Sequence, residues 1–319
     1  MVIQGERQYP TSMSNYKKNR YRQHISDDLL PLKIVGQSVA CERHPLRNED
    51  SYLIEKRSGL VAVFDGVGGS AAGEIASRTA KRATLHAWHE ALQRIYQGTL
   101  PKSHLVNYET TDFCAVLRQV IEYADEQVRT EGAREAGTDD LATTVAIALF
   151  CQRPSENDYT MIFGHVGDSR IYHLRESESL KRLTIDDGLL GRLVENQMVT
   201  EEDALHIDQA MRAEDLTDLE FSYFRLRGGI TQALGGPLPP TIHIDQAPIS
   251  LGDRILLCTD GVHDNLTDAE IESIVRKSSR NAAARRLVEH SLARSREERH
   301  ETIRAKPDDI SSIVVTRRF

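Results

Sequence analysis

Acidic residues recur in this sequence where an apolar run ends or begins. In most of these places a glycine or a second acid stands beside the aspartate. The segments are Asn48-Glu49-Asp50, Asp65-Gly66, Gly167-Asp168-Ser169, Thr259-Asp260-Gly261 and Pro307-Asp308-Asp309. If the apolar runs are strands, a rigid sheet can hold the adjoining carboxylates toward one point. We therefore treat these segments as one candidate site.

The chemistry of such a cluster follows from its charge. Like charges held together repel one another unless a cation neutralises them. Oxygen ligands without clustered cysteine or histidine favour hard divalent cations such as Mg²⁺ or Mn²⁺. An Asp-Gly pair is also typical of an ordinary turn, because Asp caps the turn and Gly adopts a positive φ. Any one pair alone favours a turn, whereas the segments together favour a metal site.

The residues between these segments predict both strands and helices. Short β-branched or fully apolar runs predict strands, and apolar residues at helical spacing predict helices. The expected strands are 32–36, 51–54, 59–64, 141–151, 159–166, 170–174, 241–244, 254–258 and 311–316. The expected helices are 70–96, 111–131, 189–196, 200–205, 268–277 and 282–296. The strands come in clusters, which favours an α+β fold with antiparallel sheets over a doubly wound parallel sheet.

Composition limits the class of protein. The chain has 319 residues, a net charge of −8 and 39% hydrophobic residues, which suits a soluble globular protein. The acidic balance disfavours nucleic-acid binding, and no apolar stretch approaches the roughly 18 residues of a membrane span. The N-terminus lacks the apolar core of a signal peptide. The cysteines Cys41, Cys114, Cys151 and Cys258 form no CxxC pair, which predicts free thiols and a cytoplasmic location.

The chain divides into two parts by composition. Residues 1–31 predict a polar N-terminal tail, and residues 32–319 predict a single domain without internal repeats. Within the domain, residues 206–229 are polar and show no clear period. We interpret this stretch as a flap or an insertion.

The ordered set of motifs resembles that of the metal-dependent Ser/Thr protein phosphatases of the 2C type (the PPM family), particularly its compact bacterial members. The matching segments are 47–51, 63–69, 142–144, 166–172, 230–235, 256–262 and 308–311. The resemblance implies a four-layer α-β-β-α sandwich, with two antiparallel central sheets flanked by helix pairs. It also implies a binuclear metal centre at one end of the sandwich.

The resemblance assigns a role to each acid. Asp65 would bridge two metal ions, and the Gly66 carbonyl would bind one of them. Asp260 and Asp308 would hold the second ion. The family's other acids, which act directly, through water or at a third and weaker ion, correspond here to Glu49, Asp50 and Asp168. Gly68 and Gly69 would let the backbone pass close to the site.

The implied cofactors are two or three Mg²⁺ or Mn²⁺ ions. The implied reaction is hydrolysis of protein phosphoserine or phosphothreonine by a water or hydroxide that two ions share, without a side-chain nucleophile. The expected partners are phosphorylated proteins, the targets of a Ser/Thr kinase. Two alternatives stay open: a catalytically weak or inactive phosphoprotein-binding regulatory module on the same fold, and a hydrolase of small phosphoesters.

The sequence departs from the family pattern in three places. The family's usual Asp-His after a Leu-Thr strand is replaced here by Asp186-Asp187, and neither acid is assigned to the site. Many relatives carry an arginine for the substrate phosphate four residues before the acid that Glu49 matches, and this chain has Pro45 there. Arg43 and Arg47 flank it, and we prefer Arg47 as the phosphate ligand. Eukaryotic relatives have a histidine after the Asp-Gly pair, whereas this chain has Val67, as bacterial relatives do.

Segment 185–229 corresponds to the family's flap. We expect it to form an acidic, mobile edge that tunes the choice of protein substrate.

Overall fold

The computed structural model describes residues 31–67, 72–96, 106–107, 112–152, 159–298 and 300–318. The predicted tail, apart from Pro31, lies outside these residues. Residues 31–319 form one unit by their contacts, in line with the predicted domain. In the described part of the chain, no helix has both the length and the apolar character that a membrane span requires.

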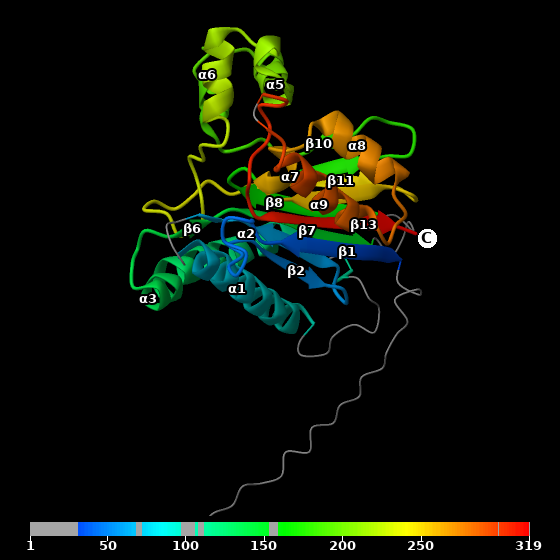
Figure 1. Cartoon of the computed structure of the whole chain (residues 1–319). Helices are drawn as coiled ribbons and strands as arrows, with labels where there is room; N and C mark the ends of the chain where they lie inside the picture. Colours follow the sequence, from blue (N-terminus) through cyan, green and yellow to red (C-terminus); the bar gives the residue numbers. More distant parts are fainter. Residues whose placement is uncertain are drawn as a thin grey trace, which may run out of the picture. The chain divides into compact units, whose positions relative to one another are not determined.

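Two sheets form the centre of the domain (Figure 1). The first sheet has the spatial order β1-β13-β12-β9-β10, and the second has the order β11-β8-β7-β3-β2, with antiparallel pairing along both. The strands of the first sheet are β1 (Leu32–Val39), β13 (Ile310–Arg317), β12 (Arg254–Cys258), β9 (Arg170–Leu174) and β10 (Lys181–Arg182). Those of the second are β11 (His243–Ile249), β8 (Tyr159–Val166), β7 (Val145–Gln152), β3 (Leu60–Phe64) and β2 (Ser51–Glu55).

Three very short strands complete the β structure. β5 (Val106–Asn107) pairs parallel to the end of β7. β4 (Gly66–Val67) and β6 (Ala142–Thr143) form a separate antiparallel pair. In the sequence, β4 follows β3 and β6 precedes β7. This small pair matters for the site, because β4 contains the glycine that follows Asp65.

The central strands are buried on both faces because each strand sends alternate side chains into two different cores. In β3, Val61 and Val63 lie in the core between the two sheets. Leu60, Ala62 and Phe64 instead pack against the helices outside. β12 and β13 alternate in the same way on the other side. This pattern gives the four layers α-β-β-α and confirms the predicted fold class.

A pair of helices covers each outer face. α1 (Ala72–Ile95) and α2 (Phe113–Gln127) pack on the second sheet, and α2 continues through a π-helical turn (Val128–Gly132) into α3 (Ala133–Ala136). α8 (Asp268–Lys277) and α9 (Ala283–Arg294) pack on the first sheet. α7 (Asp260–His263) is a single short turn that begins directly after β12.

Segment 185–229 holds three helices, which stand beyond one end of the sheets (Figure 1). They are α4 (Leu189–Glu195), α5 (Glu201–Gln209) and α6 (Asp218–Leu226), with a 3₁₀ turn at Ala213–Asp215. The stretch 206–229, which showed no clear period in the sequence, contains the end of α5 and the whole of α6. α6 has a capping box formed by Thr217 and Glu220, a start signal that is visible in the sequence. These helices share a small core of their own around Ile207 and Phe224.

Replacement of Phe150 tests the core between the sheets, because its side chain is fully buried there. Phe150→Ala should lower the free energy of unfolding by about 3–5 kcal/mol, because contacts are lost and a cavity remains. Urea unfolding followed by circular dichroism measures this change. Leu251→Ala, at a side chain that is 60% exposed, is the control and should change it by less than about 0.5 kcal/mol. Equal effects of the two variants would contradict this core.

Candidate metal centre

The register of the second sheet brings two acidic segments to the same end. The start of β2 pairs with the end of β3, where Ser51 lies opposite Phe64. Glu49 and Asp50 come just before Ser51, and Asp65 comes just after Phe64. Two segments that are separate in the sequence therefore meet at one sheet edge.

The register of the first sheet likewise brings three further acidic segments to one end of that sheet. The end of β12 pairs with the starts of both β9 and β13, since Cys258 lies opposite Arg170 and Ser312. The acids that adjoin these strand ends are Asp168, Asp260 and Asp308.

A hydroxyl joins the acid clusters of the two sheets. Thr259 Oγ1 donates to Asp50 Oδ2 at 2.7 Å and accepts from the Ser311 backbone N–H at 3.0 Å. Asp50 comes from the second sheet, whereas Thr259 and Ser311 come from the first. Sequence reasoning missed Thr259, although it directly precedes the Asp-Gly pair at 260–261.

Asp309 fixes the loop that carries the first acids. Its Oδ1 accepts from the Cys41 backbone N–H at 2.6 Å, and its Oδ2 accepts from the Glu49 backbone N–H at 2.7 Å. Both oxygens are therefore committed to backbone N–H groups. Asp309 thus positions the backbone around Cys41 and Glu49.

Two glycines allow backbone segments to approach closely around the site. A Cβ on Gly66 would lie 2.1 Å from the Gly73 carbonyl oxygen, and a Cβ on Gly261 would lie 2.0 Å from the Asp309 carbonyl oxygen. Neither position has room for any other residue. The sequence analysis predicted such a close approach at Gly68 and Gly69, and these two residues lie outside the described residues.

The acids act on one another electrostatically. Burial, followed by the charges of neighbouring acids, raises the pKa of Asp65 well above its usual value. The acids that act on Asp65 are Asp260, Asp50, Asp308 and Asp168. Burial and the charge of Asp260 raise the pKa of Asp308 to about 7. All the predicted aspartates of the site therefore face one common region.

The donor set fits a hard divalent cation. Asp50 Oδ1 is buried and, among the described residues, has no hydrogen-bond partner, while Oδ2 of the same carboxylate is held by Thr259. Burial also raises the pKa of Glu49 and, more strongly, of Asp50. A buried acceptor without a donor, inside a group of mutually repelling carboxylates, is the environment that a metal ion stabilises.

The two candidate phosphate ligands differ in position. Arg47 is half-buried, and its Nε lies 3.0 Å from Glu49 Oε1. Arg43 is exposed to solvent. The structure thus places Arg47 against one of the predicted metal ligands, whereas no such contact is recorded for Arg43 in the described part of the chain.

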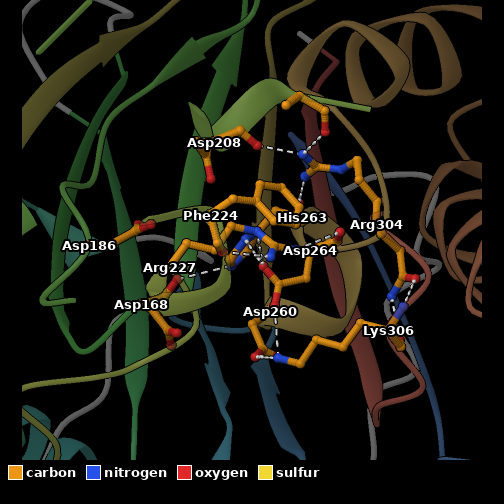
Figure 2. A network of polar contacts seen from close by, with 12 residues as sticks. Asp168, Asp186, Asp208, Phe224, Arg227, Asp260, His263, Asp264, Arg304 and Lys306 are labelled. Atoms are coloured by element: carbon orange, nitrogen blue, oxygen red, sulfur yellow. Dashed lines mark hydrogen bonds and ion pairs between the residues drawn. The ribbon is translucent and has the colours of Figure 1, made fainter. Parts of the chain in front are cut away.

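Two charged residues at the site were missed by the sequence. Lys306 Nζ lies 2.5 Å from Asp260 Oδ2 and 2.7 Å from Asp264 Oδ2 (Figure 2). It also lies 3.2 Å from Asp308 Oδ2. Burial opposes ionisation of Asp264, but Arg227 and Lys306 hold its pKa well below its usual value. Asp264 follows Asp260 by four residues, which is the spacing of one helical turn and the only signal in the sequence.

Buried ion pairs attach the flap helices to the site. Arg170 Nη2 lies 2.6 Å from Asp186 Oδ2 and 2.9 Å from Asp208 Oδ1 on α5. The fully buried Arg304 donates to the backbone carbonyls of Asp208 and His263 (Figure 2). Arg227, just after α6, lies 3.4 Å from Asp264 Oδ1 through its Nε.

The pKa shifts predict how stability depends on pH without metal. The pKa of Asp308, like those of Asp50 and Asp65, is higher in the folded state than in an unfolded chain. The stability that these carboxyls contribute is therefore full below about pH 4 and is lost as the pH rises through about 7. In a chelator, Tm should fall between pH 5 and 7.5, and Mn²⁺ should raise Tm more at pH 7.5 than at pH 5.

Differential scanning calorimetry with EDTA and with Mn²⁺ at both pH values measures this effect. A Mn²⁺-induced shift of equal size at both pH values would contradict a cluster of mutually repelling carboxylates.

Comparison with known proteins agrees with the fold. The sequence profile of Protein phosphatase 2C matches residues 39–295. The Ser/Thr protein phosphatase PstP of Mycobacterium tuberculosis is 30% identical over 246 residues, which cover 77% of this chain and 39% of that protein. The Ser/Thr phosphatase stp of Listeria innocua is 24% identical over 232 residues, which cover 72% of this chain and 77% of that protein.

A solved structure extends the similarity to nearly the whole domain. The catalytic domain of PstP in complex with 2 manganese ions is 25% identical, has a TM-score of 0.63, and covers 89% of this chain and 97% of that one. The profile match spans most of the present sequence. The chain therefore belongs to the protein phosphatase 2C family.

Proposed function

We propose that this chain is a Mg²⁺- or Mn²⁺-dependent phosphatase that hydrolyses phosphoserine and phosphothreonine in proteins. The observation that carries the proposal is the convergence of the aspartates from both sheets at one end of the sandwich, with a buried Asp50 oxygen that lacks a hydrogen-bond donor. The PstP catalytic domain, whose fold this chain shares, was solved with manganese.

The residues that would hold the ions are those that the sequence assigned. Asp65 would serve both ions, the Gly66 carbonyl would serve one of them, and Asp260 and Asp308 would serve the second. The supporting ligands would be Asp168, Asp50 and Glu49. When bound, such ions lower the pKa of a water molecule and neutralise phosphoryl oxygens.

The thiols near the site do not offer a covalent route. Burial raises the pKa values of both Cys41 and Cys258, so neither thiol is ionised at neutral pH. A thiolate rather than a thiol is the nucleophile in cysteine chemistry. This favours direct hydrolysis over a phosphocysteine intermediate.

His263 does not act as an acid at neutral pH. Burial lowers its pKa to about 4, and its Nε2 lies 3.1 Å from the Asp168 carbonyl oxygen. Its role is to hold the turn that carries Asp168.

Arg47 would orient the substrate phosphate. Its guanidinium lies against Glu49 at the edge of the acidic cluster, and a guanidinium binds phosphate oxygens through paired N–H groups. Arg43 is exposed and is the weaker candidate.

The proposed substrates are phosphorylated proteins, as for the relatives named Ser/Thr phosphatases. The aligned region covers only 39% of PstP, so this proposal concerns the catalytic chain alone. We also place the enzyme in the cytoplasm, because all four cysteines are free thiols. Its counterpart would be a Ser/Thr kinase that phosphorylates the same proteins.

Replacement of single site acids tests the proposal. Asp65→Asn and Asp260→Asn should each lower kcat/KM on a phosphothreonine peptide by at least about 100-fold, because even outer-shell partners of metal ligands are worth 10–100-fold. Phosphate release with and without Mn²⁺ is the measurement. Asp139→Asn, at an exposed loop position, removes the same charge and should leave the rate unchanged.

The outcomes separate the candidate functions. Turnover without metal, or full activity in both variants, would refute the proposed function. Metal-dependent peptide binding without phosphate release would favour the regulatory module. Activity on aryl phosphate alone would favour a small-phosphoester hydrolase.

The flap surface is expected to contact protein substrates. Leu205 on α5 and Leu219 on α6 are 49% and 61% exposed. The double variant Leu205→Ser/Leu219→Ser should lower kcat/KM on a phosphoprotein by about tenfold, equivalent to about 1.4 kcal/mol, and leave an aryl phosphate unaffected. Parallel assays of the two substrates measure this selectivity.

Point substitutions are preferable to deletion of the flap, because Asp208 within it neutralises the buried Arg170. Leu251→Ser, in the turn between β11 and β12 at the opposite end of the sheets, is the control. Equal loss on both substrates would show that the flap serves the chemistry rather than substrate choice.

A further inference from the structure

A side-chain cation already occupies part of the acidic cluster. The Lys306 ammonium contacts carboxylate oxygens of Asp260 and Asp264 at 2.5 and 2.7 Å (Figure 2). It also contacts Asp308 at 3.2 Å. Asp260 and Asp308 are the acids assigned to one divalent ion by the proposed function. A single ammonium thus makes the oxygen contacts that this ion would need.

The backbone around Lys306 is fixed. The buried Asn265 accepts from the Lys306 N–H through Oδ1 at 3.1 Å and donates to the Lys306 carbonyl through Nδ2 at 2.9 Å. Two residues earlier, the fully buried Arg304 is bound to carbonyls of α5 and α7. Pro307 further restricts the conformation of the residue before it. The lysine side chain therefore starts from a defined point beside the acids.

The ammonium also has a way out to water. The Lys306 side chain is 35% exposed, whereas that of Asp264 is 4% exposed. Gly228, at the end of the flap, borders this position, because a Cβ there would lie 3.7 Å from Lys306 Nζ. A four-carbon stem allows the charged end to move into solvent without movement of the backbone.

We propose that Lys306 competes with one divalent cation for the carboxylates of Asp260 and Asp308. The Lys306 ammonium must leave these carboxylates before that ion binds fully. The inference rests on the proposed function, since it concerns the same metal centre. A fixed positive charge at contact distance from shared ligands opposes a second cation by direct repulsion and by occupying the oxygen atoms. Lys306 therefore weakens binding of this ion and makes its loading depend on the free metal concentration.

The affinity of the metal-free protein for Mn²⁺ tests the proposal. In isothermal titration calorimetry, Lys306→Gln should bind one Mn²⁺ at least tenfold more tightly than the natural chain. Lys306→Arg keeps the charge and should not show this gain. Lys277→Gln removes one positive charge from the exposed end of α8 and should bind Mn²⁺ like the natural chain.

The thermal stability of the same proteins gives a second readout. In EDTA, Lys306→Gln should have a lower Tm than the natural chain, because Asp260, Asp264 and Asp308 lose the ammonium that contacts them. With Mn²⁺ this order should disappear or reverse. An unchanged Mn²⁺ affinity in folded Lys306→Gln would overturn the role of Lys306 and leave the metal-dependent function standing. No Mn²⁺ binding by either protein would overturn both.

A measurement on the natural chain tests the proposal even if a variant does not fold. Amine acetylation at Lys306, followed by mass spectrometry on the natural chain, should become several-fold faster when Mn²⁺ is added, because the displaced ammonium enters solvent. Acetylation of Lys277 serves as the internal reference. A Lys306 rate that Mn²⁺ leaves unchanged relative to Lys277 would overturn the proposal.

Discussion

The mutual repulsion of the aspartates at one end of the sandwich is the constraint on which the rest of the structure depends. Folding alone makes these groups harder to ionise, as the raised pKa values of Asp50, Asp65 and Asp168 indicate. The strands cannot move apart to relieve the repulsion, because both faces of each central strand are packed into a core. The energy of the three cores thus maintains a site that the acids themselves oppose.

The contacts around the site fix each carboxylate while leaving oxygen atoms for a cation. Thr259 holds Oδ2 of Asp50, and Oδ1 of the same group stays without a donor. Asp309 uses both of its oxygens on backbone N–H groups and so positions Glu49 rather than serving as a ligand. Hydrogen bonds to charged groups contribute about 1.5–3 kcal/mol each, enough to orient a side chain against local repulsion.

The sequence predicted those parts of the site whose signals are local. Apolar runs bounded by Asp-Gly pairs identified the strand ends around Asp65 and Asp260, and the antiparallel class followed from the clustering of strands. The family resemblance then supplied the four-layer arrangement. Asp208 and Lys306 escaped notice because their partners, Arg170 and Asp264, lie 38 and 42 residues away in the chain. No periodic pattern reports a contact of that kind.

The flap illustrates the same limit at the level of secondary structure. α6 has nine residues, of which Phe224 and Tyr223 pack in a small core shared with α4 and α5 rather than in one of the large cores. Leu219 and Leu226 of the same helix are exposed, so its apolar residues give only a weak periodic signal, although its capping box is visible in the sequence.

The charge balance connects the flap with the metal centre. The carboxylate of Asp264 is divided between two cations, with Oδ1 near Arg227 at the end of the flap and Oδ2 near Lys306. Arg227 is held in turn by the Phe224 carbonyl and by the face of the Phe224 ring. Any displacement of α6 that carries Arg227 away leaves Asp264 with Lys306 as its remaining close counter-ion, which strengthens the hold on the ammonium beside Asp260. The flap and Lys306 are thus linked through one buried carboxylate.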